Sequence, residues 1–131
     1  MTISTKRVHD KAEPLTDGTR ILIVLHESIA NLKKCPYDKL MKELAPSYDL
    51  HRKFQLNIKN HKWTEEEWEE YSKRFKEEML ASIWSRNAIA KLSEMSAAGQ
   101  KITLLCYCPD EKYCHRTLVK DLIDNWQTIN E

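Results

Sequence analysis

Two apolar runs without polar alternation predict buried strands. Residues 20–25 read Arg-Ile-Leu-Ile-Val-Leu, and residues 101–108 read Lys-Ile-Thr-Leu-Leu-Cys-Tyr-Cys. Runs of this kind are typical of parallel strands that are covered on both faces. A weaker pattern between Ile3 and Val8 predicts a third, short strand.

Apolar residues recur at helical spacing through the middle of the chain. Trp68, Tyr71, Phe75 and Met79 follow one another at steps of three and four, which predicts one apolar stripe on a helix of about four turns. Thr64 followed by Glu67 is a capping-box pair, so this helix is expected to begin there.

The same spacing predicts four other helices. Residues 85–98 and 114–127 form the clearer ones. A short helix over 36–44 is expected to end at Ala45-Pro46, because proline cannot continue it. Ser47 can then cap a helix over 48–57.

Strands followed by helices predict an α/β fold. We expect a small, mainly parallel sheet with helices on its faces and a helix-rich middle segment. The chain has 131 residues, of which 41% are hydrophobic, and it contains neither a repeat nor a linker. It is therefore expected to form a single domain over 1–131.

Charge and hydropathy narrow the class of protein. The 21 Lys and Arg residues nearly balance 20 Asp and Glu residues, which removes the simplest electrostatic case for a nucleic-acid binder. The longest aliphatic run, residues 21–25, is too short to span a bilayer, and the first residues lack the apolar stretch of a signal peptide. We expect a soluble cytoplasmic protein without a membrane partner; a homodimer is compatible with these features.

One local stretch departs from this neutral balance. Residues 51–62 carry basic side chains and no acidic ones, with Phe54 within the stretch and Trp63 directly after it. Basic and aromatic side chains together can contact phosphates and bases. Glutamates follow directly at 65–70, so compensating charged faces are the more ordinary explanation.

The cysteines carry the most specific pattern. Cys106, Cys108 and Cys114 fall within nine residues and are followed by His115 and Arg116, whereas Cys35 is isolated and expected to be structural. The cluster lies between a predicted strand and a predicted helix, where α/β proteins bind ligands and helix N-termini attract anions.

Spacing predicts that these side chains converge. Cys106 and Cys108 are two apart and share a strand face. Cys114 and His115 lie four and three residues before Leu118 and extend its stripe toward the sheet. Arg116 lies off that stripe and is expected to face the loop mouth or solvent.

Three interpretations of this cluster stay open. Cys106, Cys108, Cys114 and His115 could bind zinc or iron. Alternatively, Cys114 or Cys108 could be a catalytic thiolate with His115 as its partner and Arg116 holding a small anionic substrate, nucleotide-like or sulfur-containing. The third interpretation is that the cysteines only pack as small apolar side chains, and it is the most ordinary of the three.

Other candidates lie near the ends of the predicted strands. His26 follows the first buried strand and could act as a general base or ligand, although a lone histidine there is more often a polar strand end. Arg7 and Arg20 could bind an anion, although solvated arginines are commoner.

The order of several motifs is similar to that of a known family. They are Lys6-Arg7-Val8-His9, Asp17 to Ile23, Leu40 to Ser47, the helical set Trp68, Tyr71, Phe75 and Glu78, and the strand Ile102 to Leu105. Together they resemble family number 488 of the domains of unknown function, small intracellular α/β proteins. The segment Cys-x-Cys-x5-Cys-His-Arg resembles one branch of it. The resemblance implies the fold and carries no settled activity.

The chain departs from this family at one place. Many relatives carry Asp-Arg-Leu-Trp-Pro-Arg-Gly after the first buried strand, where this chain has Val24 to Ala30. Both arginines and the aspartate are absent. If those residues form an active site in relatives, this chain either lost that site or uses the cysteine loop instead.

Overall fold

A computed structural model describes residues 3–7, 10, 12–24, 37–107 and 111–129. In these residues the strands β1 (Ile3–Arg7), β2 (Thr19–Leu22), β3 (Lys39–Leu40) and β4 (Ile102–Cys106) form one sheet in the order β1-β4-β2-β3. Every neighbouring pair is parallel. The predicted α/β fold with a mainly parallel sheet is therefore confirmed.

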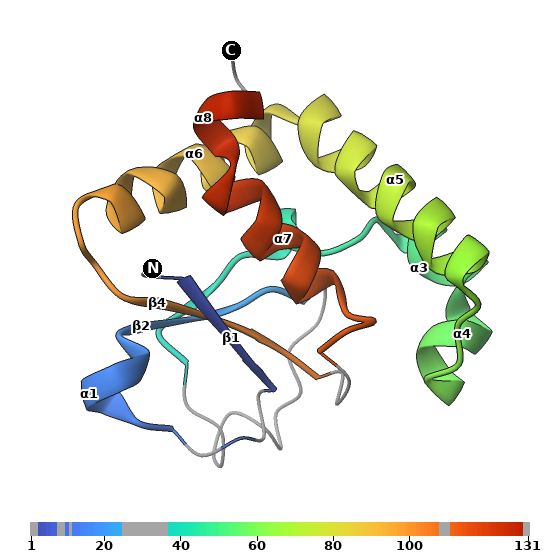
Figure 1. The fold of residues 1–131 in the computed structure, drawn as a ribbon, viewed down its shortest axis with the longest axis horizontal. Helices are drawn as coiled ribbons and strands as arrows, with labels where there is room; N and C mark the ends of the chain where they lie inside the picture. The colour runs from blue at the N-terminus through green and yellow to red at the C-terminus, as the bar shows by residue number, and fades with distance from the viewer. Residues whose placement is uncertain (1–2, 8–9, 11, 25–36, 108–110, 130–131) are drawn as a thin grey trace.

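Helices cover this sheet and connect its strands. Figure 1 shows the longer ones together on one side of the sheet, with the short α1 beside the start of β2 and with α3 and α4 next to the first turns of α5. The elements are α1 (Pro14–Asp17), the 3-10 helix η1 (Lys42–Leu44), α3 (Tyr48–Lys53), α4 (Gln55–Asn60), α5 (Glu65–Ala81), α6 (Ile83–Ala97), α7 (His115–Asp124) and α8 (Trp126–Ile129). Among the described helices, none combines the length and apolar character needed to cross a bilayer.

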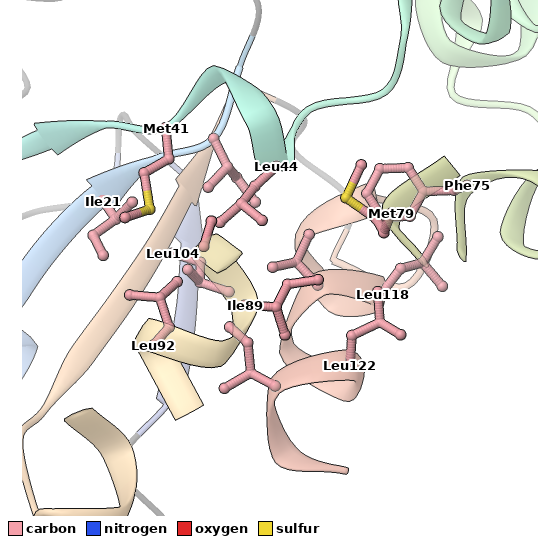
Figure 2. Close-up of a cluster of buried hydrophobic side chains, with 14 of the residues drawn as sticks. Ile21, Met41, Leu44, Phe75, Met79, Ile89, Leu92, Leu104, Leu118 and Leu122 are labelled. Carbon is pink, nitrogen blue, oxygen red and sulfur yellow. The ribbon is translucent and has the colours of Figure 1, made fainter. Parts of the chain in front are cut away.

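One apolar core lies between the sheet and these helices. Figure 2 shows side chains from the sheet meeting those of α5, α6, α7 and η1, and it labels Ile21, Leu104, Phe75, Met79, Ile89, Leu92, Leu118, Leu122, Met41 and Leu44. All ten are buried, and each contributes about 1.5–3 kcal/mol of burial free energy. This core fixes α7 over the sheet and thereby the position of its first residues.

The predicted helix caps are confirmed at two places. The Thr64 hydroxyl accepts from the Glu67 N–H at 3.1 Å, and the Glu67 carboxylate accepts from the Thr64 N–H at 3.0 Å, completing a capping box for α5. The Ser47 hydroxyl accepts from the Leu50 N–H at 3.1 Å. The single helix expected over 48–57 is interrupted at Phe54, which separates α3 from α4.

The prediction of a helix over 36–44 was wrong. Lys39 and Leu40 extend the sheet as β3, in register with Ile21 and Leu22, and η1 follows after Met41. The Met41 N–H donates to the Leu22 carbonyl at 2.9 Å. The free edge of β2 offers these residues sheet hydrogen bonds, which outweigh their local preference for helix.

Gly18 sets the turn between α1 and β2. Its φ is 65°, and a Cβ placed there would lie 2.2 Å from the Lys101 carbonyl oxygen. Only glycine avoids both the backbone strain and the overlap.

An ion cluster around the buried Asp17 links β1 to the start of β2. Asp17 bonds to Arg20 and lies 2.8 Å from Lys6 Nζ, and its carboxylate accepts the Glu13 N–H at 3.0 Å. Burial alone would raise the pKa of Asp17, but these hydrogen bonds from Glu13, Lys6 and Arg20 outweigh it and lower the pKa. The hydrogen bond to Asp17 raises the pKa of Lys6.

Candidate functional site

The strand β4 ends where α7 begins, and three chemically reactive side chains meet there. Cys106 is the last residue of β4, Cys114 is the N-cap of α7, and His115 is its first residue. All three are buried, and their ligand atoms lie within 4.8 Å of one another. The convergence expected from the spacing is confirmed for these three residues.

The ring of His115 is held at both nitrogens. Its Nε2 lies 2.6 Å from the Ile23 carbonyl oxygen, and its Nδ1 lies 3.7 Å from Cys106 Sγ. A carbonyl oxygen only accepts, so Nε2 carries the hydrogen. In the neutral ring Nδ1 is then the unprotonated nitrogen, and it faces the Cys106 thiol.

Cys114 is the N-cap residue of α7, but its sulfur does not cap the helix. Its backbone is extended, with φ −137° and ψ 142°, and its side chain makes no capping hydrogen bond to α7. The sulfur therefore stays beside Cys106 and His115 and does not satisfy the first turn of the helix.

The expectation that Arg116 faces the loop mouth or solvent was wrong. Its side chain is 3% exposed. Arg116, Val119 and Ile123 form a second buried stripe on α7, because the helix packs against β1 and β4 as well as α5 and α6. The Nε and Nη1 atoms of Arg116 have no hydrogen-bond partner among the described residues.

A second arginine lies at the same edge of the sheet. Arg7 is the last residue of β1 and pairs in register with Cys106. Because register partners on parallel strands point to the same face, Arg7 lies beside Cys106. Its Nε is also buried without a partner in the described part of the chain.

The loop before α7 is tied to β1 near these arginines. The Thr5 hydroxyl donates to a Glu111 carboxylate oxygen at 3.0 Å, and the Thr117 hydroxyl donates to the Glu111 carbonyl at 2.6 Å. These bonds fix the start of α7 relative to β1, so that Arg7 and Arg116 lie at one edge.

A cavity of about 410 Å³ opens beside the cysteines. Cys106, Cys114 and His115 line it together with many rings, among them Tyr48, His51, His61, Trp63, Tyr107 and Tyr113. None of the described residues that line it carries a carboxylate. This cavity was not predicted from the sequence. Its signal there is the density of aromatic and histidine residues between 48 and 71 and around the cysteine loop.

Of the remaining sequence candidates that the structure describes, Arg20 does not join this group. Arg20 is buried on β2 and bonded to Asp17, near the amino end of the strand. Cys108, His26 and Cys35 lie outside the described residues.

The three ligand atoms also fit a metal ion. Cysteine sulfur and imidazole nitrogen are ligands that zinc and iron accept, and three protein ligands with one open position are typical of catalytic zinc. The Nε2 bond to Ile23 is the support that metal-binding histidines usually have.

The chain matches one known protein family over most of its length. Residues 3–127 match the family model described as "Active DUF488-N3 subclade", DUF488-N3a. The match covers nearly the whole chain, including β1, β4 and α7. Neither the curated proteins nor the solved structures contain a match to the chain.

Proposed function

This chain belongs to the DUF488 family, in its DUF488-N3 subclade, and from that premise we propose that it is a thiol-dependent enzyme with Cys106 as its nucleophile. The observation that carries the proposal is the orientation of His115 between the Ile23 carbonyl and the Cys106 sulfur. A nucleophile, a base and a group that orients the base are the three parts of such a site.

The chemistry follows from these positions. His115 Nδ1 accepts the Cys106 proton, and the thiolate attacks an electrophilic atom of the substrate to form a covalent intermediate. The positive end of α7, a helix of ten residues, stabilises negative charge at the cluster. The protonated His115 then returns its proton to the leaving group.

The proposed nucleophile differs from the two candidates that the sequence suggested, Cys114 and Cys108. Cys114 is next to His115 in the chain, but it is Cys106 Sγ that lies 3.7 Å from Nδ1. In this proposal Cys114 is the neighbouring thiol that resolves an oxidised or modified Cys106. Such chemistry requires reduced thiols, which the cytoplasm supplies.

Unpartnered guanidinium nitrogens of Arg116 and Arg7 support a small anionic substrate. A buried guanidinium without a counter-charge is costly, and an anion beside it removes that cost. Arg116 and Arg7 are the two candidates at this edge of the sheet. A phosphate, sulfonate or carboxylate group of the substrate would offset their charge close to Cys106.

Labelling of the thiols tests the nucleophile directly. The protein is reacted with a limiting amount of iodoacetamide at about pH 6, where ordinary thiols are protonated, and the modified cysteines are located by mass spectrometry. We expect Cys106 to be labelled first, and Cys106→Ser to abolish this fast phase while Cys114→Ser keeps it. Fast labelling that persists in Cys106→Ser contradicts the proposal.

A second candidate function is a metal centre. It is supported by the mutual distances within 4.8 Å of the Cys106, Cys114 and His115 ligand atoms. Zinc or iron held there would occupy the thiolate and replace the proposed nucleophile. Elemental analysis of protein purified without chelator distinguishes the two functions. Near-stoichiometric metal that is lost in Cys106→Ser and in Cys114→Ser supports the metal centre. Metal-free protein excludes it.

A further inference from the structure

We infer that the cavity beside Cys106 binds a nucleotide, with the base against its aromatic wall and the phosphate toward the start of α7. This inference rests on the proposed function, because it names the class of the anionic substrate. It joins three observations: exposed rings in the cavity wall, basic side chains on the segment that supplies two of those rings, and unpartnered guanidinium nitrogens of Arg116 in the first turn of α7.

The rings of the cavity are of two kinds. Tyr71 is buried and packs in the core, where Phe54 and Phe75 contact it. Tyr48 is 66% exposed although it is large and aromatic, and His51 and His61 are exposed as well. Core packing therefore explains the inner ring and leaves the outer ones without a structural role.

Trp63 connects these two groups. It lines the cavity and packs against Trp68 at 5.1 Å and against Tyr71 at 5.2 Å between ring centroids. Tyr113, from the loop before α7, stacks on it at 6.5 Å. The aromatic wall is thus held rigidly from behind, as a stacking platform for a flat ligand requires.

His61 ends α4 in a backbone conformation that most non-glycine residues avoid. Its φ is 54°, the left-handed region, directly after α4. The turn is held by Asn57, whose side chain donates to the Lys62 carbonyl at 2.9 Å and whose carbonyl accepts the Lys62 N–H at 3.2 Å. A non-glycine residue in this region costs about 1 kcal/mol or more, and such residues cluster at ligand sites.

The segment 51–62, which supplies part of the cavity lining, carries net positive charge, and this charge favours an anion. The segment 51–62 supplies His51, Ile58 and His61 to the lining, and it also carries Arg52, Lys53, Lys59 and Lys62 with no acidic residue. Lys53 forms an ion pair with Glu70 at 3.6 Å. No ion pair joins the other three to a carboxylate in the part of the chain that the structure describes, so the glutamates at 65–70 compensate the segment only in part.

Together these features match a nucleotide better than other small ligands. A cavity of about 410 Å³ lies within the usual range for small-molecule sites. An apolar ligand would leave the basic segment 51–62 without a counter-charge, and that segment would repel an aromatic amine. A base with a phosphate can stack on the rings and offset the positive charge of this segment or of Arg116 at the start of α7.

Calorimetric titration of the whole protein tests the inference. The probes are the four ribonucleoside 5′-monophosphates, with adenosine, ribose 5-phosphate and inorganic phosphate as partial ligands. We expect at least one monophosphate to bind about tenfold or more tightly than any partial ligand, because the base and the phosphate each contribute. Equal binding of ribose 5-phosphate or of adenosine overturns the inference, as does the absence of binding.

Variants separate the cavity from the fold. His61→Gly removes a ring and relieves the positive φ, so we expect unchanged or higher thermal stability and a loss of affinity of about tenfold. Tyr48→Ala should weaken binding as well. Trp84→Ala is the matched control, because Trp84 is 75% exposed and does not line the cavity. Equal binding by His61→Gly, Tyr48→Ala and the parent protein contradicts the inference.

Two further titrations complete the test. One distinguishes a free nucleotide from the end of a nucleic-acid strand, and the other separates failure of the nucleotide site from failure of the proposed enzyme. A short 5′-phosphorylated single-stranded oligonucleotide that binds more tightly than the monophosphate, with strong salt dependence, points to a strand end; weaker binding points to free nucleotide, and both support the nucleotide site. Titrating Cys106→Ser keeps the cavity without the thiol. If Cys106→Ser binds nucleotide but no cysteine of the parent protein is alkylated quickly, only the proposed enzyme is overturned. If Cys106 is alkylated quickly but no nucleotide binds, only this inference is overturned.

Discussion

The imidazole of His115 lies 2.6 Å from the backbone carbonyl of Ile23, although 92 residues separate the two in the chain. The bond joins the end of the β2 segment to the first residue of α7. It therefore does two things at once: it fixes the position of α7 over the sheet, and it determines which ring nitrogen faces Cys106. A backbone carbonyl orients the ring without adding a charge to the site.

Removing this ring should separate reactivity from folding. In His115→Gln we expect the fast alkylation of Cys106 to slow by about a hundredfold, because the thiol loses its base. The free energy of unfolding should fall by less than about 1 kcal/mol, because the glutamine amide can still donate to the buried Ile23 carbonyl. Alkylation rates and denaturant unfolding measure the two effects.

The control for this variant is His51→Gln. His51 lines the same cavity but is exposed and lies on α3. It should leave both the Cys106 rate and the stability nearly unchanged. Equal slowing in the two variants would show that His115 has no special relation to Cys106.

The ion cluster at Asp17 predicts a dependence of stability on pH. The pKa of Asp17 is lowered in the folded protein, so its contribution is present above about pH 4 and is lost as the pH falls through the folded pKa. The pKa of Lys6 is raised, so its contribution is present below about pH 10 and is lost as the pH rises through the folded value. Unfolding midpoints across pH should show both losses.

Asp17→Asn tests the same cluster at neutral pH. It leaves Arg20, which is 5% exposed, without its carboxylate, and should cost about 3–5 kcal/mol of unfolding free energy. The acid-dependent loss should then be smaller than in the parent protein. Asp121→Asn is the control: its pair with Lys76 is exposed and should contribute less than about 1 kcal/mol. Similar effects of the two substitutions would contradict the assigned role.

The fold was largely predictable because its signals are local. The unbroken apolar runs of β2 and β4 and the stripe of α5 each lie within one short segment. The capping box at Thr64 is likewise a four-residue pattern. In contrast, β3 has two residues and exists only because β2 has an edge beside it, so no local pattern could reveal it.

The site was predictable only in part, for the same reason. Strand and helix periodicity brought Cys106, Cys114 and His115 together correctly. The Ile23 carbonyl carries no side-chain signal. The cavity draws its rings from α3, α5, α7 and the segments that follow α4 and β4, which meet only in the folded chain. Arg116 was misplaced because α7 has two buried stripes, and a charged residue on the second one resembles a surface residue in sequence.

The two glycines with positive φ, Gly18 and Gly99, should differ sharply in how well they tolerate replacement by alanine. At Gly18 an added Cβ would overlap the Lys101 carbonyl, whereas at Gly99, where φ is 86°, nothing lies within 4 Å. Gly99→Ala should therefore cost only the backbone strain, about 1 kcal/mol. Gly18→Ala should cost about 3 kcal/mol or more, because the turn between α1 and β2 must move. Thermal unfolding compares the two, and equal losses would contradict the close contact with Lys101.

Arg116 offers a test that needs no substrate. A guanidinium that is 3% exposed and unpartnered at Nε and Nη1 lowers the stability of the ligand-free protein, so Arg116→Met, of similar shape, should raise the free energy of unfolding by about 1–3 kcal/mol. Inorganic phosphate should stabilise the parent protein by binding beside this charge and should stabilise Arg116→Met much less. Arg74→Met is the control, because Arg74 is exposed and already paired with Glu70 at 3.0 Å. If Arg116→Met is destabilised and responds to phosphate as the parent does, the arginine supports the packing of α7 and does not bind the anion.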